Sequence, residues 1–230
     1  MICIPITDES MRGALADIRE AGKIADVLEL RLDYIKGLNE KALKELVSAS
    51  EKKVIATVRR ENEGGKFKGT ESKRVELLKK AIKAGVHFVD IEFEMNSKQR
   101  AALLKYAKTQ HVKVILSHHD FKGTPFFEEL LELFEKMSKV KGVYALKIAT
   151  YARTHEDNSL IFRLLRVARK KNRRLISFSM GALGRDSRIL SLPLGSYLTF
   201  GSLASGKESA EGQIEAKELK KIYSGLKVMI

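Results

Sequence analysis

Short apolar runs with the length of β-strands alternate with longer amphipathic stretches along the whole chain. The eight runs cover residues 2–6, 27–32, 54–58, 88–93, 112–117, 143–149, 175–179 and 197–200. Helical patterns cover residues 11–21, 42–49, 74–84, 98–108, 126–137, 160–170 and 215–224, and only a short stretch, 187–192, is available for the seventh helix. Strict alternation requires crossover connections and therefore parallel strands. Eight such units in 230 residues predict an α/β protein, a (β/α)8 barrel in a single domain spanning residues 1–230.

An open, doubly wound sheet is the alternative to the barrel. That fold would favour a glycine-rich phosphate loop after an early strand, and the sequence has none. No proline- or serine-rich linker divides the chain. Within the barrel, Thr124 and Pro125 are expected to be the N-cap and first residue of the fifth helix, because proline suits that first position.

The charge balance is strongly basic, with 43 Lys and Arg against 29 Asp and Glu, a net charge of +14. The only dense basic cluster, residues 169–174, contains no aromatic residue and lies where a helix ends. We interpret it as a solvated helix end rather than a nucleic-acid patch, because cations suit a helix C-terminus. No apolar run reaches the roughly 18–20 residues of a membrane span. With the single Cys3 and no signal-peptide pattern, we expect a cytoplasmic protein that binds neither nucleic acid nor membrane.

Charged residues alternate on the second strand candidate. Glu29, Arg31 and Asp33 share one face, whereas the leucines between them suit the contact with the helices. Three charges should therefore point into the barrel, where each costs several kcal/mol unless it is paired or functional. An active-site role and a structural ion-pair cluster are both possible, and the position near the end of the strand favours the active site.

Lys147 lies on the inward face of the sixth strand candidate, between small apolar residues. Burial destabilises an ammonium ion, which makes a buried lysine usable as an amine nucleophile. The alternatives are a lysine that reaches out to the barrel mouth or pairs with a carboxylate of the second strand. We favour the catalytic interpretation.

The fifth strand candidate ends in Ser117-His118-His119-Asp120. Strand parity directs His119 inward and His118 outward. Two histidines and an aspartate also suit a metal, but neighbouring strand residues face opposite ways, so we expect no metal. Polar residues follow most of the other strands as well, including a charged loop from Arg59 and a loop rich in Gly, Ser and Ala over residues 201–212. Active sites of (β/α)8 barrels lie at this carboxyl-terminal face.

Six motifs in this order resemble the type I 3-dehydroquinate dehydratases of the shikimate pathway, which leads to chorismate and the aromatic amino acids. The resemblance covers essentially the whole chain. The motifs are Glu29-x-Arg31-x-Asp33, Thr57-x-Arg59-x-x-x-Glu63-Gly64-Gly65, Ser117-x-His119-Asp120-Phe121, Lys147-Ile148-Ala149, Ser179-Met180-Gly181-x-x-Gly184-x-x-Ser187-Arg188 and Ser209-Ala210-x-Gly212-Gln213.

The resemblance implies a lyase that dehydrates 3-dehydroquinate to 3-dehydroshikimate without a cofactor. Lys147 would form an imine with the substrate ketone, His119 would act as general base and then acid, and Glu63 would orient His119. Arg188 would bind the substrate carboxylate. The remaining substrate-binding or supporting positions would be Glu29, Arg31, Arg59, Met180, Ser209 and Gln213. The family also suggests a homodimer.

The implied chemistry suits these groups. A histidine with an ordinary pKa of about 6.5 cannot readily remove a proton beside a ketone, whereas an iminium ion accepts the electrons of that C–H bond. Another imine-forming barrel, an aldolase or transaldolase, is the alternative enzyme. Arg188 and His119 favour a small keto acid over a sugar phosphate as the substrate.

One departure from the family is Glu211, where bacterial members commonly have proline. We expect the loop 201–212 to act as a lid, and Glu211 to make that lid more flexible and to add a negative charge near the anionic substrate.

Overall fold

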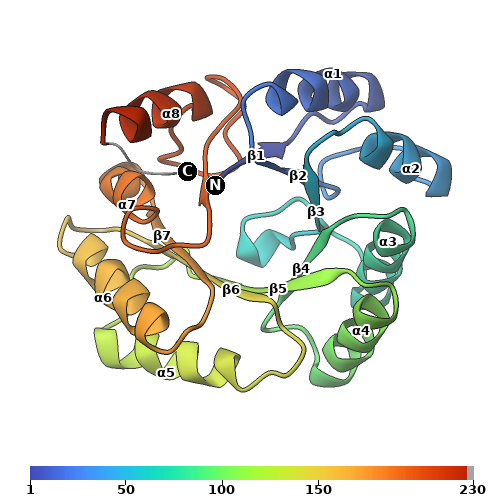
Figure 1. The fold of residues 1–230 in the computed structure, drawn as a ribbon. Coiled ribbons are helices and arrows are strands. Elements are labelled where there is room, and N and C mark those ends of the chain that lie inside the picture. Colours follow the sequence, from blue (N-terminus) through green and yellow to red (C-terminus); the bar gives the residue numbers. More distant parts are fainter. Residues whose placement is uncertain (227–230) are drawn as a thin grey trace.

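A computed structural model of the chain describes residues 1–226, and in it eight parallel strands form a nearly closed barrel. The strand order is β7-β6-β5-β4-β3-β2-β1-β8, and Figure 1 labels β1 to β7 around the barrel. The strands are β1 (Ile2–Ile6), β2 (Val27–Arg31), β3 (Lys53–Thr57), β4 (Phe88–Glu92), β5 (Lys113–His119), β6 (Ala145–Tyr151), β7 (Leu175–Met180) and β8 (Thr199–Phe200). The ends of the order meet where the Tyr197 N–H donates to the Leu175 carbonyl at 2.8 Å. The predicted (β/α)8 barrel is confirmed; the predicted domain, residues 1–230, extends four residues beyond those described.

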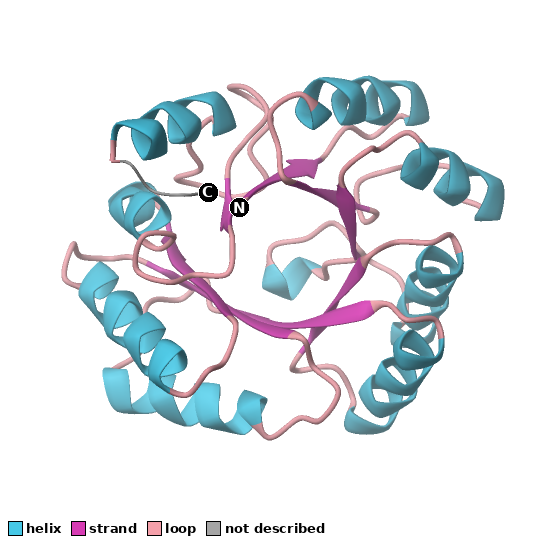
Figure 2. Cartoon of the chain, viewed as in Figure 1, coloured by secondary structure: helices cyan, strands magenta, loops and turns pink. Residues whose placement is uncertain are grey.

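Within residues 1–226, eight α-helices surround the strands (Figure 2). They are α1 (Met11–Gly22), α2 (Glu40–Ser48), α3 (Glu71–Lys83), α4 (Ser97–Thr109), α5 (Phe127–Ser138), α6 (Asp157–Lys170), α7 (Arg185–Leu190) and α8 (Ala216–Gly225). Two short 3-10 helices, η1 (Glu61–Glu63) and η2 (Ala182–Gly184), follow β3 and β7. The expected weak helix, α7, is indeed the shortest of the eight and has only six residues.

The start of α5 differs from the prediction. The helix begins at Phe127 with Phe126 as N-cap, so Thr124 and Pro125 stand outside it. The Thr124 hydroxyl instead donates to the Tyr151 carbonyl at 3.1 Å and lies 2.8 Å from the Thr150 hydroxyl. These contacts with β6 hold the loop in a conformation that delays the helix.

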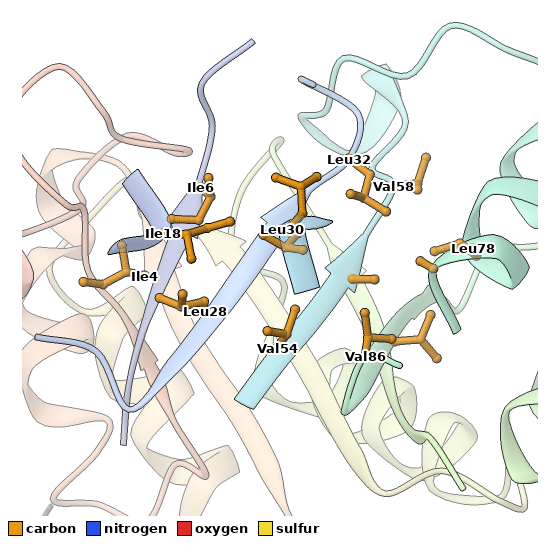
Figure 3. Close-up of a cluster of buried hydrophobic side chains, with 14 of the residues drawn as sticks. Ile4, Ile6, Ile18, Leu28, Leu30, Leu32, Val54, Val58, Leu78 and Val86 are labelled. Carbon is orange, nitrogen blue, oxygen red and sulfur yellow. The ribbon is translucent and has the colours of Figure 1, made fainter. Parts of the chain in front are cut away.

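Strand parity divides the core into two parts. Leu28 and Leu30 of β2 point outward and belong to the same buried cluster as Ile18 of α1 (Figure 3). A second cluster, which includes Cys3, Ile55 and Ile115, fills the interior of the barrel. Full burial of one such leucine or isoleucine contributes roughly 1.5–3 kcal/mol. The inward-facing strand residues are thus apolar near the amino ends of the strands. The buried charges of the barrel lie toward the carboxyl ends.

Candidate active site

A pocket lies at the carboxyl ends of the strands. All ten predicted site residues line it: Glu29, Arg31, Arg59, Glu63, His119, Lys147, Met180, Arg188, Ser209 and Gln213. Each of β2, η1, β5, β6, β7, α7 and the loop before α8 contributes at least one of them, and Arg59 lies two residues beyond the end of β3. The aromatic rings of Phe121, Phe178 and Phe200, which the sequence analysis did not include in the site, are also part of the wall.

Lys147 points into this cavity from the middle of β6. Its Nζ lies 3.7 Å from Glu29 Oε1 and 3.9 Å from Asp90 Oδ2, and 4.2 Å from the centre of the Phe200 ring. Its neighbours on the same face of β6 are alanines, as expected, but the surroundings are not purely apolar, because β2 and β4 each direct a carboxylate at the amine. The inward lysine and its pairing with a second-strand carboxylate, treated above as alternatives, occur together.

His119 and Glu63 form a close pair beside the lysine. His119 Nδ1 lies 3.1 Å from Glu63 Oε2, and Glu63 Oε1 has no hydrogen-bond partner among the described residues. Burial raises the pKa of Glu63 to about 8 despite the opposing charge of Arg59. Burial, followed by the charges of Arg59 and Lys147, lowers the pKa of His119 well below its ordinary value. Both side chains are therefore uncharged over much of the neutral range.

The number of protons in this pair decides what His119 can do. A protonated Glu63 donates to Nδ1, which leaves the only ring proton on Nε2 and makes that nitrogen a donor. An ionised Glu63 accepts a hydrogen bond from Nδ1–H, which leaves the Nε2 lone pair free. The pair gains a general base only when it loses a proton.

Arg59 connects several polar side chains at the bottom of the site. It donates to Asp90 Oδ1 at 2.8 Å, to Ser117 Oγ at 2.9 Å and to Glu92 Oε1 at 3.1 Å. Burial opposes the charge of Arg59, yet Asp90 and Glu92 raise its pKa above the ordinary value. Its charge is thus matched by the protein itself, and a direct contact of Arg59 with substrate stays a prediction.

Asp90 and Glu92 were missed in the sequence analysis. They occupy alternate positions on β4, the same pattern that singled out Glu29 and Arg31 on β2. Parity alone could have found them. Arg31 itself is paired with Asp33 through contacts of 2.7 and 3.0 Å.

Arg188 is the one buried guanidinium at the site without a charge partner among residues 1–226. It is fully buried and lies 4.5 Å above the centre of the Phe178 ring. Nη2 donates to the Glu211 carbonyl at 3.2 Å, but Nε and Nη1 have no partner. Burial lowers the pKa of Arg188 to about 9, so the group is still a cation at neutral pH. A buried cation with open donors at a cavity is suited to an anion such as a carboxylate.

The loop before α8 covers the cavity with Ser209 and Gln213. Gln213 folds back on the loop, since its Oε1 accepts from the Ser209 N–H at 2.7 Å and its Nε2 donates to Ser209 Oγ at 3.1 Å. Met180, 2% exposed at the end of β7, forms part of the wall. The hydroxyl of Ser209 and the amide of Gln213 can form hydrogen bonds with hydroxyl groups of a ligand.

His118 turns away from the cavity, as predicted, and its Nδ1 lies 3.7 Å from a carboxylate oxygen of Glu94. No group of three or more His, Cys, Asp or Glu within residues 1–226 is arranged to hold a metal ion. Over the same range, none of the helices is long and apolar enough to cross a membrane.

Comparison with known proteins identifies one family. The family model "Type I 3-dehydroquinase" matches residues 2–229. The 3-dehydroquinate dehydratase of Methanococcus maripaludis (strain C7) is 39% identical over 224 residues, which cover 96% of this chain and 98% of that protein. The enzyme of the same name from Methanocaldococcus jannaschii is 35% identical, with 97% of each chain covered.

Solved structures agree. The type I 3-dehydroquinate dehydratase from Clostridium difficile, crystallised with covalently modified comenic acid, superimposes with a TM-score of 0.89 at 29% identity, covering 98% of this chain and 91% of that one. The 3-dehydroquinate dehydratase from Geobacillus kaustophilus gives 0.91 at 26% identity, covering 98% and 90%. The resemblance noted in the sequence is confirmed, and the chain belongs to the type I 3-dehydroquinase family of hydro-lyases.

Proposed function

We propose that this protein dehydrates 3-dehydroquinate to 3-dehydroshikimate through an imine on Lys147, as a step of the shikimate pathway. The observation that carries the proposal is Arg188, a buried cation whose Nε and Nη1 lack partners at the cavity that also contains Lys147 and His119. A small keto acid satisfies all three groups. Its carboxylate neutralises Arg188, its ketone meets the amine, and the proton beside the ketone meets the histidine.

The first stage forms the imine. The unprotonated Nζ of Lys147 attacks the ketone carbon. The resulting carbinolamine takes up one proton, which the later hydrolysis returns, and loses its hydroxyl as water to give a protonated imine. Glu29 and Asp90, 3.7 and 3.9 Å from Nζ, stabilise this positive charge. Their placement favours the iminium ion over the neutral carbinolamine from which it forms.

The second stage is the elimination. His119 Nε2 removes a proton from C2, and the electrons of that C–H bond move toward the iminium nitrogen to give an enamine. The histidinium then protonates the hydroxyl on C1, which leaves as water while the C1–C2 double bond forms. Water hydrolyses the conjugated imine, releasing 3-dehydroshikimate and the free lysine. The contact with Glu63 stabilises the transient imidazolium ion.

Four further predictions stay predictions. The homodimer and the absence of a cofactor rest on the family resemblance, whereas the cytoplasmic location and the absence of nucleic-acid binding rest on composition and charge pattern.

Borohydride reduction in the presence of 3-dehydroquinate tests the imine. We expect intact-mass and peptide mass spectrometry to find a stable adduct on Lys147, and Lys147→Ala to give neither adduct nor turnover. Sugar phosphates should produce no adduct. An unmodified wild-type protein that still dehydrates the substrate would rule out the imine, and sugar-phosphate turnover in place of dehydration would rule out the substrate.

A further inference from the structure

Glu211 lies at the point where the loop before α8 meets two other segments. Its carboxylate does not line the cavity; Oε2 instead accepts a hydrogen bond from the Tyr151 hydroxyl at 2.8 Å. Tyr151 ends β6, the strand that carries Lys147. The expectation that Glu211 adds charge beside the substrate is therefore wrong, because the tyrosine holds the carboxylate outside the site.

The backbone of Glu211 makes the second connection. Its carbonyl accepts hydrogen bonds from the Gly181 N–H and from Arg188 Nη2, both at 3.2 Å. The bond to Arg188 is the only one that this guanidinium makes with any residue in the described range 1–226. The orientation of Arg188 therefore depends on where the loop places this carbonyl.

Two glycines show how tightly the loop packs against the end of β7, and the end of β7 against Tyr151. A Cβ added to Gly212 would lie 2.2 Å from the Gly181 carbonyl oxygen, and one added to Gly181 would lie 2.8 Å from the Tyr151 ring. Both glycines also have positive φ, 78° and 83°. The loop reaches the end of β7 only because neither glycine has a side chain.

The other side of the loop is held separately. Lys207 forms an ion pair with Asp17 of α1. The loop is thus fastened to α1 at one point and to the ends of β6 and β7 at another. Only the second point also contacts Arg188.

We propose that the Tyr151–Glu211 hydrogen bond is a latch that holds the loop 201–212 closed and thereby positions Arg188 for the substrate carboxylate. Tyr151 and Glu211 are positioning residues, because neither touches the reacting atoms. Closing the loop and preparing the carboxylate site are then one event. The identity of the ligand rests on the proposed function, whereas the latch itself does not.

Tyr151→Phe removes the latch hydroxyl and keeps the ring against Gly181. We expect the KM for 3-dehydroquinate and the Kd for quinate, which has no ketone and cannot form an imine, to rise about five-fold. The kcat should stay within about two-fold, because chemistry at Lys147 follows binding. Tyr197→Phe is the matched control, since it also removes a bonded tyrosine hydroxyl but at the opposite end of the barrel, and it should change neither constant.

Trypsin provides a readout that needs no ligand. Cleavage after Lys207 requires local opening of the loop, so the unliganded Tyr151→Phe protein should be cut there several-fold faster than wild type, with an unchanged urea midpoint. Glu211→Ala should behave like Tyr151→Phe, and the double variant should add nothing further.

Unchanged KM and unchanged cleavage in Tyr151→Phe would overturn the latch, as would additive effects in the double variant. A parallel fall in kcat and in the urea midpoint would also overturn it, because that pattern marks a general packing role. If the wild-type protein does not dehydrate 3-dehydroquinate, the proposed function fails, but the trypsin comparison still decides whether the latch exists.

Discussion

Replacing Arg188 with methionine should greatly weaken carboxylate binding without destabilising the unliganded protein. Burial lowers the pKa of Arg188 from 12.5 to about 9, and a tenfold change in proton affinity is worth about 1.4 kcal/mol. The buried charge therefore costs the fold about 5 kcal/mol. Because the charged form is the one that burial penalises, this cost applies in full below pH 9 and declines as the pH rises above it.

Two contacts offset part of that cost. The hydrogen bond from Nη2 to the Glu211 carbonyl contributes about 1.5–3 kcal/mol, and the contact with the Phe178 ring contributes about 2 kcal/mol. Methionine loses both together with the charge. The net expectation for Arg188→Met is a free energy of unfolding between unchanged and about 1.5 kcal/mol higher, or a Tm up to about 6 °C higher.

Arg59→Met is the matched contrast, because Arg59 is equally buried but paired. Its removal leaves Asp90 without a guanidinium partner, which should lower the free energy of unfolding by about 3–5 kcal/mol. Urea unfolding of the two unliganded variants beside wild type measures the difference.

Binding should respond in the opposite sense to stability. Two open donors to a carboxylate are worth about 3–6 kcal/mol together, so Arg188→Met should raise the Kd for quinate about 10²–10⁴-fold. Calorimetry measures it. A loss of 3 kcal/mol or more in the stability of Arg188→Met would refute the reasoning, since it would mean that Arg188 already has a charge partner. So would quinate binding within tenfold of wild type.

Three further outcomes are expected. In the pH–rate profile, kcat/KM should rise as the pH passes through about 8, where the pair of Glu63 and His119 loses a proton. The Glu63→Gln variant should show no such rise, and its rate should be about 10²-fold lower. A rise that persists in the variant would assign the titration to another group. Gly212→Ala should lower the urea-derived stability by about 1–3 kcal/mol more than Gly206→Ala, because both have positive φ but only Gly212 faces a carbonyl; equal losses would contradict the packing argument. Lys147→Arg should keep a positive charge between Glu29 and Asp90 and should keep the protein folded, yet show no dehydration in an absorbance assay. Measurable turnover would exclude the lysine amine as the nucleophile.

Strand parity placed four of the ten predicted site residues, Glu29, Arg31, His119 and Lys147, and the family resemblance supplied the other six. Alternation is a property of the strand itself, so Glu29 and Lys147 could be directed into the barrel from the sequence alone. The same rule, applied to β4, would have added Asp90, which was passed over because no motif drew attention to it. The start of α5 was misplaced because contacts of Thr124 with β6 outweigh the local preference for proline at a helix start.

The local pattern of this chain was enough for the barrel, the family and the inward-facing groups. Alternation and helix periodicity repeat every few residues and need no knowledge of distant partners. The electrostatics needed the folded chain. Arg188 proved to be a cation with open donors, Lys147 to lie between two carboxylates, and Glu211 to bind Tyr151 instead of facing the substrate. Each of these depends on which segments, distant in sequence, the closed barrel brings within a few ångströms, and on the water that their packing excludes.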